Sequence, residues 1–234
     1  MICRFLLSFL EIIDKLCRQG KKRICFNIYM DFLKKNALED GRMQEKKSIH
    51  YNPYEGTNIV LIEKLIKSGV ISPEDHIADI GCGAGIFLLY LASRGFYNLS
   101  GYEIDQTLYE QGQKNIESFY SKRKDSSNKI ELLNVDAVNT EYPSDITCFY
   151  LFNTFYDKDT YLSWIKKVYS SWRDNQRKIK IIILFPTVAS MGALRECNWL
   201  RETGRVIDKS HPCWRCVNFL VYETIDEKDS QIPV

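Results

Sequence analysis

Apolar and polar positions along the chain form two alternating patterns. Short, almost continuous apolar runs predict buried strands, and they occupy Ile77–Ile80, Leu99–Asp105, Ile130–Leu133, Ile146–Phe152 and Lys180–Phe185. Longer stretches between these runs predict helices, and they occupy Asn58–Ser68, Ile86–Arg94, Gln106–Tyr120 and Asp159–Trp172. Strands that alternate with helices in this way indicate an α/β protein with a mostly parallel sheet.

The pattern changes towards the end of the chain, where strands follow each other without a helix. Arg205–Asp208 and Val217–Glu223 predict two short strands joined by a loop. With the five preceding strands, they predict a Rossmann-like sheet of seven strands with one antiparallel strand and helices on both faces.

The first 47 residues predict a helical extension, and residues 48–234 predict the main domain. Met1–Cys17 has helical periodicity, but Arg4, Glu11 and Asp14 interrupt it, so it does not suit a membrane span or a signal peptide. A basic run follows, and Ile24–Asn36 predicts a second helix. The extension could pack on the main domain, or residues 1–23 could contact a membrane surface as a peripheral helix.

Composition restricts the class of protein further. The chain has 234 residues, of which 45% are hydrophobic, which suits one ordinary domain and a small appendage. Residues 1–47 hold 11 Lys and Arg against 6 Asp and Glu, whereas the remainder holds 21 against 24. The main domain therefore offers no overall basic field for nucleic acid. Eight scattered cysteines predict reduced thiols in a cytoplasmic protein.

The most informative motif follows the first predicted strand. Asp79 ends an apolar run, and Gly81, Gly83 and Gly85 stand at alternate positions before a helix. Glycines without a Cβ let a ligand approach the backbone closely. The spacing differs from the Gly-x-Gly-x-x-Gly motif of dinucleotide-binding proteins, and no Gly-Lys-Ser/Thr of a phosphate-binding loop follows. The glycine spacing therefore argues against a nicotinamide dehydrogenase, which an absence of NAD binding would exclude.

A second signal is an acidic residue at the end of the next strand. Glu103 lies 24 residues beyond Asp79, and an acid about 20 residues after the glycine turn accepts hydrogen bonds from ribose hydroxyls. Asp105 would serve in a shifted register. Asp136 follows the third predicted strand in the same way.

Together these residues resemble motif I and the following acidic positions of the class I S-adenosylmethionine (SAM) methyltransferases. The resemblance covers residues 51 to about 223. Within the family, the chain is similar to small bacterial methyltransferases of uncertain substrate. It implies that the turn binds the methionine part of SAM, that Asp136 bonds the adenine amino group, and that Ile104 lies against the adenine. The cofactor-binding residues that it implies are Thr57, Asp79, Gly81, Cys82, Gly83, Gly85, Glu103, Ile104, Asp136 and Ala137.

The resemblance also gives two expectations for segments that flank the pocket. The stretch from Tyr51 to Thr57 would close over the methionine end of SAM, although a turn that caps the next helix explains most of it. The N-terminal helices would form a lid over the pocket, as a third interpretation of residues 1–47.

The residues after the fourth strand are the candidates for the chemistry. Members of the family that methylate amides or adenine carry Asn/Asp-Pro-Pro-Tyr/Phe here, whereas this chain has Asn153, Thr154 and Phe155 and is one residue short. Asn153 is the best candidate for a residue near the methyl group. Asp157 and His211 are candidate general bases, which only a hydroxyl or a protonated amine acceptor requires.

A metal site and a non-catalytic function are the alternatives to this interpretation. Cys213, Cys216, His211 and Cys197 match zinc-ligand spacing poorly, and packing cysteines explain them better. The alternative function is a SAM-binding scaffold that docks to a partner or membrane through its N-terminal helix, since Thr154 leaves room for lost catalysis. The methyl acceptor stays open among a protein, RNA, a small metabolite and a sugar precursor.

Overall fold

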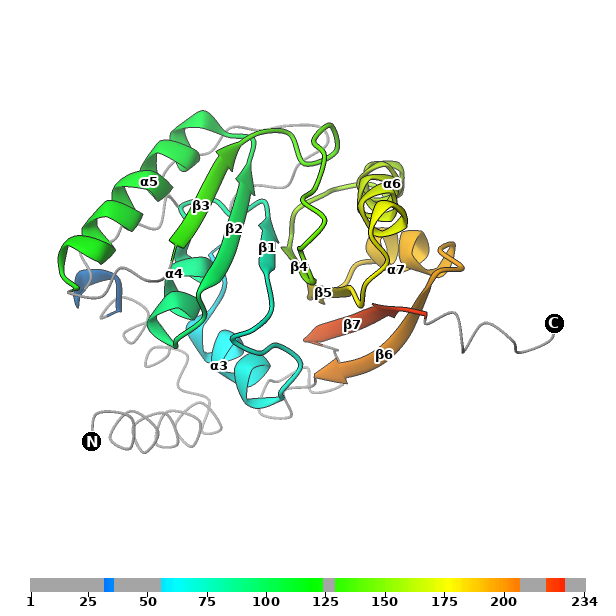
Figure 1. The fold of residues 1–234 in the computed structure, drawn as a ribbon, viewed down its shortest axis with the longest axis horizontal. Helices are drawn as coiled ribbons and strands as arrows, with labels where there is room; N and C mark the ends of the chain where they lie inside the picture. Colours follow the sequence, from blue (N-terminus) through cyan, green and yellow to red (C-terminus); the bar gives the residue numbers. More distant parts are fainter. Residues whose placement is uncertain (1–31, 36–55, 124–128, 207–217, 226–234) are drawn as a thin grey trace.

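The computed structural model describes residues 32–35, 56–123, 129–206 and 218–225, and these form a sheet with helices around it (Figure 1). The strands are β1 (Ile77–Ile80), β2 (Asn98–Glu103), β3 (Lys129–Asn134), β4 (Cys148–Phe152), β5 (Lys180–Leu184), β6 (Leu200–Val206) and β7 (Phe219–Thr224). The helices are α3 (Ile59–Lys67), α4 (Ile86–Ser93), α5 (Gln106–Ser121), α6 (Lys158–Asp174) and α7 (Val188–Arg195).

The seven strands lie in the order β3-β2-β1-β4-β5-β7-β6. The pairs from β3 to β5 are all parallel, while β7 runs antiparallel to both β5 and β6. One strand of the seven is therefore reversed, which confirms the predicted mixed sheet. The strand order turns back at β1, whose neighbours are β2 and β4. A parallel α/β sheet binds ligands at such a switch point, beyond the carboxyl ends of the strands.

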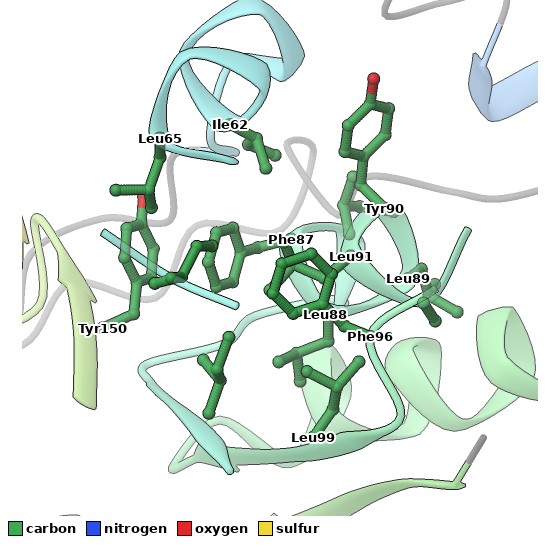
Figure 2. Packing of buried hydrophobic residues seen from close by; sticks show 14 of the residues in the cluster. Ile62, Leu65, Phe87, Leu88, Leu89, Tyr90, Leu91, Phe96, Leu99 and Tyr150 are labelled. Atoms are coloured by element: carbon green, nitrogen blue, oxygen red, sulfur yellow. The ribbon is translucent and has the colours of Figure 1, made fainter. Parts of the chain in front are cut away.

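Both faces of the sheet are covered, because alternate residues along each strand enter different hydrophobic clusters. Cys148 and Tyr150 of β4 pack with α3, α4 and α5, whereas Phe149 and Leu151 of the same strand pack with α6 and α7. Helix α4 lies in the first of these clusters, and its residues from Ile86 to Ala92 are all buried. Figure 2 shows side chains of α3 and α4 meeting Tyr150 in this cluster.

Two predictions about the C-terminal half are wrong in detail. Helix α7 was not expected, because its eight residues carry a glycine and no strong apolar face; a capping box between Thr187 and Ser190 begins the helix. The sixth strand begins at Leu200 rather than Arg205. Among the described residues, strand β6 pairs only with β7, and it is mostly exposed. Its polar residues therefore show no hydrophobic pattern that would have revealed it.

The N-terminal extension is described only at residues 32–35, which are helical as the sequence predicts. Leu33 is buried, and the ring of Phe32 meets that of Tyr90 edge-on at 5.1 Å between centroids. This part of the extension packs on α4. The rest of residues 1–47 lies outside the described residues. Among the helices that the structure describes, none has both the length and the apolar content needed to cross a membrane.

Candidate functional site

The glycine turn and the acidic residues converge on the carboxyl edge of the sheet. Ile80 lies beside Tyr102 of β2 and beside Leu151 of β4, and Phe152 lies beside Leu184 of β5. Neighbouring parallel strands therefore end at nearly the same level. The loops after β1, β2, β4 and β5 consequently share one edge, as the sequence predicts (Figure 1).

The glycine turn depends on three left-handed backbone conformations. The φ angles are 78° at Gly81, 54° at Gly83 and 74° at Gly85, which residues with a Cβ adopt only at a cost. The amides of Gly81 and Cys82 both donate to the carbonyl of Tyr102, at 2.8 and 3.1 Å, and so attach the turn to β2. A Cβ on Gly81 would also lie 3.0 Å from Cγ2 of Thr154. The turn thus requires glycine by conformation and by space.

Cys82 contributes to this turn through its backbone. Its side chain is buried, and a Cβ on Gly101 of β2 would lie 2.7 Å from its Sγ, so the thiol packs over that glycine. Burial is the main cause that raises the pKa of the thiol, with the charges of Asp79 and Glu103 adding to it. Cys82 is therefore a protonated packing residue, and a ligand at the turn would meet its main chain.

Glu103 joins the glycine turn to the end of β2. Its Oε2 accepts a 2.7 Å hydrogen bond from the amide of Gly83, and its Oε1 accepts one of 2.8 Å from the amide of Asp105. Burial raises the pKa of this carboxyl, while the two backbone hydrogen bonds lower it in part. One acidic side chain therefore holds both loops in place, and each carboxylate oxygen keeps a further lone pair for a ligand.

Asp79 differs from Glu103 in having no compensating donor. The residue as a whole is 4% exposed, and no described residue donates a hydrogen bond to its carboxylate. Burial, followed by the nearby charge of Glu103, raises its pKa well above the usual range. Asp79 also lines a small cavity, whose other walls are Gly56, Thr57, Gly81, Cys82, Ile86, Phe87 and Phe152. A buried, donorless carboxylate at a cavity favours a ligand with a positive charge.

Thr57 lines this cavity and forms a hydrogen bond with Tyr150 in the core. Its Oγ1 lies 3.1 Å from the hydroxyl of Tyr150, whose ring stacks on Phe87 with 3.9 Å between centroids. Figure 2 shows Phe87 and Tyr150 at this position beneath α3. The neighbouring Asn58 caps α3 by accepting from the amide of Val60 at 2.9 Å. The hydroxyl of Thr57 therefore serves the pocket wall and leaves the helix cap to its neighbour.

The loop after β3 lies beside the end of β2. The amide of Val135 donates to the carbonyl of Glu103 at 3.0 Å. Asp136 accepts from the amide of Val138 at 3.1 Å and from the side-chain amide of Asn139 at 2.8 Å, so its carboxylate shapes a turn.

The apolar neighbours of this turn differ in exposure. Ala137 is buried, and its carbonyl accepts from the hydroxyl of Tyr142 at 2.8 Å. Ile104, in contrast, is 44% exposed, although it follows the buried Glu103 directly. The structure thus places Ile104 on the open side of the edge.

The segment after β4 is bent sharply at Asn153, whose φ is 51°. The next residue, Thr154, is buried, and its hydroxyl donates to the carbonyl of Ile80 at 2.7 Å. Threonine here joins the ends of β4 and β1, at the position where the sequence comparison expected proline. Sequence reasoning treated Thr154 as a departure from a motif and missed this structural role.

The two candidate bases have different outcomes. Asp157 caps α6, because its carboxylate accepts from the amide of Thr160 at 2.9 Å and from the hydroxyl of the same residue at 2.8 Å. A carboxylate held in this way has an evident structural role. His211 lies outside the described residues, as do Cys213 and Cys216 of the weighed zinc site. In the part of the chain that the structure describes, no three metal-ligating side chains gather.

Sequence reasoning missed the aromatic residues that end the two central strands. Phe152 ends β4, and its ring lies edge-on to Phe185, at 6.0 Å between centroids. Phe185 has a φ of 50° and is 39% exposed. The sequence signal that could have indicated them is their position, because both lie at the carboxyl end of a buried parallel strand.

A larger cavity, of about 550 Å³, opens at the opposite edge of the sheet. Its walls include Asp75 and Lys180, whose charged groups are 2.6 Å apart, and Thr147, which donates to Asp75 at 3.0 Å. Its charged groups are engaged with one another. This larger cavity lies at the other end of the strands from the glycine turn. We therefore do not assign the candidate site to it, although it is larger than the cavity beside Asp79.

Comparison with known proteins agrees with this architecture. No protein-family model matches the chain. A curated relative from Dictyostelium discoideum, a histone-lysine N-methyltransferase specific for lysine 79 of H3, is 32% identical over 111 residues. The match covers 44% of this chain but only 6% of that relative, so it concerns a small part of a much longer protein.

Solved structures give a broader match. The chain is similar to magnesium protoporphyrin IX methyltransferase from Synechocystis with bound SAM (TM-score 0.51, 14% identity, 70% of this chain and 76% of that one). It is also similar to TrmN from Thermus thermophilus (0.53, 13%, 72% and 49%). An RNA methyltransferase from Salinibacter ruber with bound S-adenosylhomocysteine gives 0.50 at 16% identity, covering 76% and 97%. The chain has the fold of the class I SAM-dependent methyltransferases.

Proposed function

We propose that this protein is a methyltransferase that uses SAM. The observation that carries the proposal is the pair of buried carboxylates, Asp79 and Glu103, on either side of a turn with three left-handed glycines. This arrangement lies at the switch point of the sheet, and two neighbours that share its fold are methyltransferases crystallised with SAM or S-adenosylhomocysteine.

The residues present suit the chemical groups of SAM. Asp79 offers a buried negative charge without a donor, which fits the α-ammonium group of the methionine part. Glu103 keeps lone pairs for the ribose hydroxyls, and Ile104 and Ala137 offer apolar contact for the adenine. The small cavity beside Asp79 encloses only about 20 Å³. Most of the cofactor would therefore lie along the open edge of the sheet.

When bound, SAM supplies a methyl group on a sulfonium for displacement by a nucleophile. The protein's own contribution is to align the acceptor and to exclude water. Asn153 follows β4 directly and has a constrained backbone, so it is the residue we propose next to the acceptor. Asp157 and His211 remain proposals as bases, and the cap that Asp157 forms makes it the weaker candidate.

The acceptor classes in the names of the relatives differ, so they do not select one for this chain. The curated relative is named for a lysine side chain, and the structural neighbours are named for a porphyrin and for RNA. The alternative, a scaffold that binds SAM without turnover, would leave the same pocket intact.

A turnover assay separates the enzyme from the scaffold. Purified protein is incubated with SAM radiolabelled on the methyl group and with a cell extract, and transfer to protein, RNA and small-molecule fractions is counted. The proposal predicts label in one fraction that disappears with Gly81→Ala protein. Binding of S-adenosylhomocysteine without transfer to any fraction would favour the scaffold.

A further inference from the structure

The exposed apolar side chains of this protein gather at the edge of the proposed active site. Large apolar residues with an exposed fraction of at least 39% are few among the described residues. Four of them follow the strands that surround the switch point, namely Ile104 after β2, Tyr156 after β4, and Phe185 and Val188 after β5. Tyr156 is 71% exposed and Val188 is 85% exposed. This edge therefore presents an apolar and aromatic surface to a ligand.

Two residues at this edge, one after β4 and one after β5, have unfavourable backbone conformations. Asn153 and Phe185 directly follow Phe152 and Leu184, which are paired neighbours in β4 and β5. Both have φ near 50°, a conformation that is uncommon for asparagine and an outlier for a bulky ring. The amide of Phe185 donates to the carbonyl of Asn218 at 2.7 Å, which helps to hold the bend. Such conformations cluster where a protein positions a ligand.

The charges of the same loops all have one sign. Residues 81–85, 104–105, 135–142, 153–157 and 185–187 contain aspartates and a glutamate but no lysine, arginine or histidine. The nearest cation in the chain sequence is Lys158, the first residue of α6, and its Nζ pairs with Glu196. Asp79 and Glu103 lie buried below these loops. The described part of the edge therefore has acidic and aromatic groups and lacks a free basic one.

This charge pattern discriminates between acceptor atoms. A hydroxyl or carboxylate acceptor reacts as an oxyanion, whose charge needs a cation or preorganised donors nearby. A neutral amine reacts differently: its lone pair forms the N–CH₃ bond while the C–S bond breaks and leaves its electron pair on sulfur. The positive charge thus moves from sulfur to nitrogen, and a proton then leaves the new ammonium group to water. Aromatic faces and carboxylates stabilise a positive charge through the whole of this step.

Resting on the proposed function, we infer that the methyl acceptor is an amine carried on an apolar stem. Phe152, Phe185 and Tyr156 contact the stem and the developing ammonium group, and Asn153 orients the nitrogen.

The inference is tested with probes of equal stem length and different charge. Protein saturated with S-adenosylhomocysteine is titrated calorimetrically with hexyltrimethylammonium, hexanol and hexanoate. We expect hexyltrimethylammonium to bind about tenfold more tightly than either other probe, a difference of about 1.4 kcal/mol. Phe185→Leu and Tyr156→Leu should each remove most of this preference and leave the affinity for S-adenosylhomocysteine within about twofold.

Tyr97→Leu provides the matched control. Tyr97 is an aromatic residue of similar exposure, at 48%, but it precedes β2 and so lies at the opposite edge of the sheet. The preference for hexyltrimethylammonium should be unchanged in this variant. Equal binding of the three probes, tighter binding of hexanoate, or no binding of hexyltrimethylammonium would overturn the inference. Each of those results leaves the proposed function standing if S-adenosylhomocysteine binds, whereas failure of that first binding step removes both.

Discussion

Replacing Asp79 with asparagine should stabilise the unliganded protein at neutral pH and weaken cofactor binding. The carboxyl group is buried, receives no hydrogen bond from the described residues, and lies near the charge of Glu103. Its negative charge is therefore unfavourable in the folded protein until a cationic ligand arrives. Asparagine has almost the same shape and carries no charge, so it removes this cost.

The pH dependence gives the prediction its sign and its size. Because the folded protein raises the pKa of Asp79, it binds more protons than the unfolded chain above pH of about 4. The free energy of unfolding therefore falls as pH rises through the interval between the unfolded and the folded pKa. The slope is at most about 1.4 kcal/mol per pH unit for each proton involved. Burial raises the pKa of Glu103 too, so the two carboxyls titrate as a coupled pair and the variant removes one of them.

The measurement is urea unfolding of the wild type and of Asp79→Asn between pH 5 and pH 8. The variant should be the more stable protein at pH 8, and the difference should shrink as pH falls. The same variant should bind SAM about 10 to 100 times more weakly, because a hydrogen bond to a charged group contributes about 1.5–3 kcal/mol. A variant that is less stable than the wild type at pH 8 would refute the reasoning, since it would mean that the carboxylate stabilises the empty fold.

Three further substitutions test separate parts of the fold. Gly81→Ala places a Cβ on a residue with a φ of 78°, at 3.0 Å from Cγ2 of Thr154. The variant should lose about 1–2 kcal/mol of stability in thermal unfolding and should not bind S-adenosylhomocysteine. Unimpaired binding would contradict the geometry of the turn. Thr154→Val keeps the side-chain volume but removes the hydrogen bond to the carbonyl of Ile80. Denaturant unfolding should show a loss of about 1–3 kcal/mol in the free energy of unfolding. No loss would mean that this hydrogen bond does not stabilise the fold. Lys180→Met removes the cation that pairs with Asp75 at the opposite edge of the sheet, and only hydrogen-bond donors such as Thr147 then remain for that carboxylate. The variant should cost about 3 kcal/mol in the same assay without changing cofactor affinity, so a loss of affinity with retained stability would contradict the placement of the site.

The central sheet could be predicted from the sequence because its strands are buried on both faces. Such strands appear as continuous apolar runs, and β4 and β5 are clear examples. The seven-stranded arrangement with one reversed strand was predicted correctly. Strand β6 and helix α7 were misplaced or missed, because an exposed edge strand and a helix begun by a capping box have little hydrophobic pattern.

The candidate site was predictable to the extent that it depends on strand ends. Asp79 lies near the carboxyl end of its predicted strand and Glu103 near the end of the next, so their convergence at one edge follows from parallel pairing. The sequence could not show that Glu103 bonds the amide of Gly83, or that Asp79 has no donor, because both depend on the path of the turn. The strain at Asn153 and Phe185 was equally hidden, since neither residue type signals a positive φ in this context as glycine does.

The most direct test of the central claim is calorimetric titration of S-adenosylhomocysteine and SAM into the wild type, Glu103→Ala and Glu103→Gln. Glu131→Gln is the matched control, because Glu131 is an exposed glutamate on the neighbouring β3. Folding of each variant is checked by circular dichroism, since Glu103→Ala leaves the amides of Gly83 and Asp105 without their acceptor. The account predicts micromolar binding to the wild type and the control, and at least about tenfold weaker binding, a loss of about 1.4 kcal/mol, to both Glu103 variants. No binding to the folded wild type, or equal affinity in folded Glu103 variants, would contradict it.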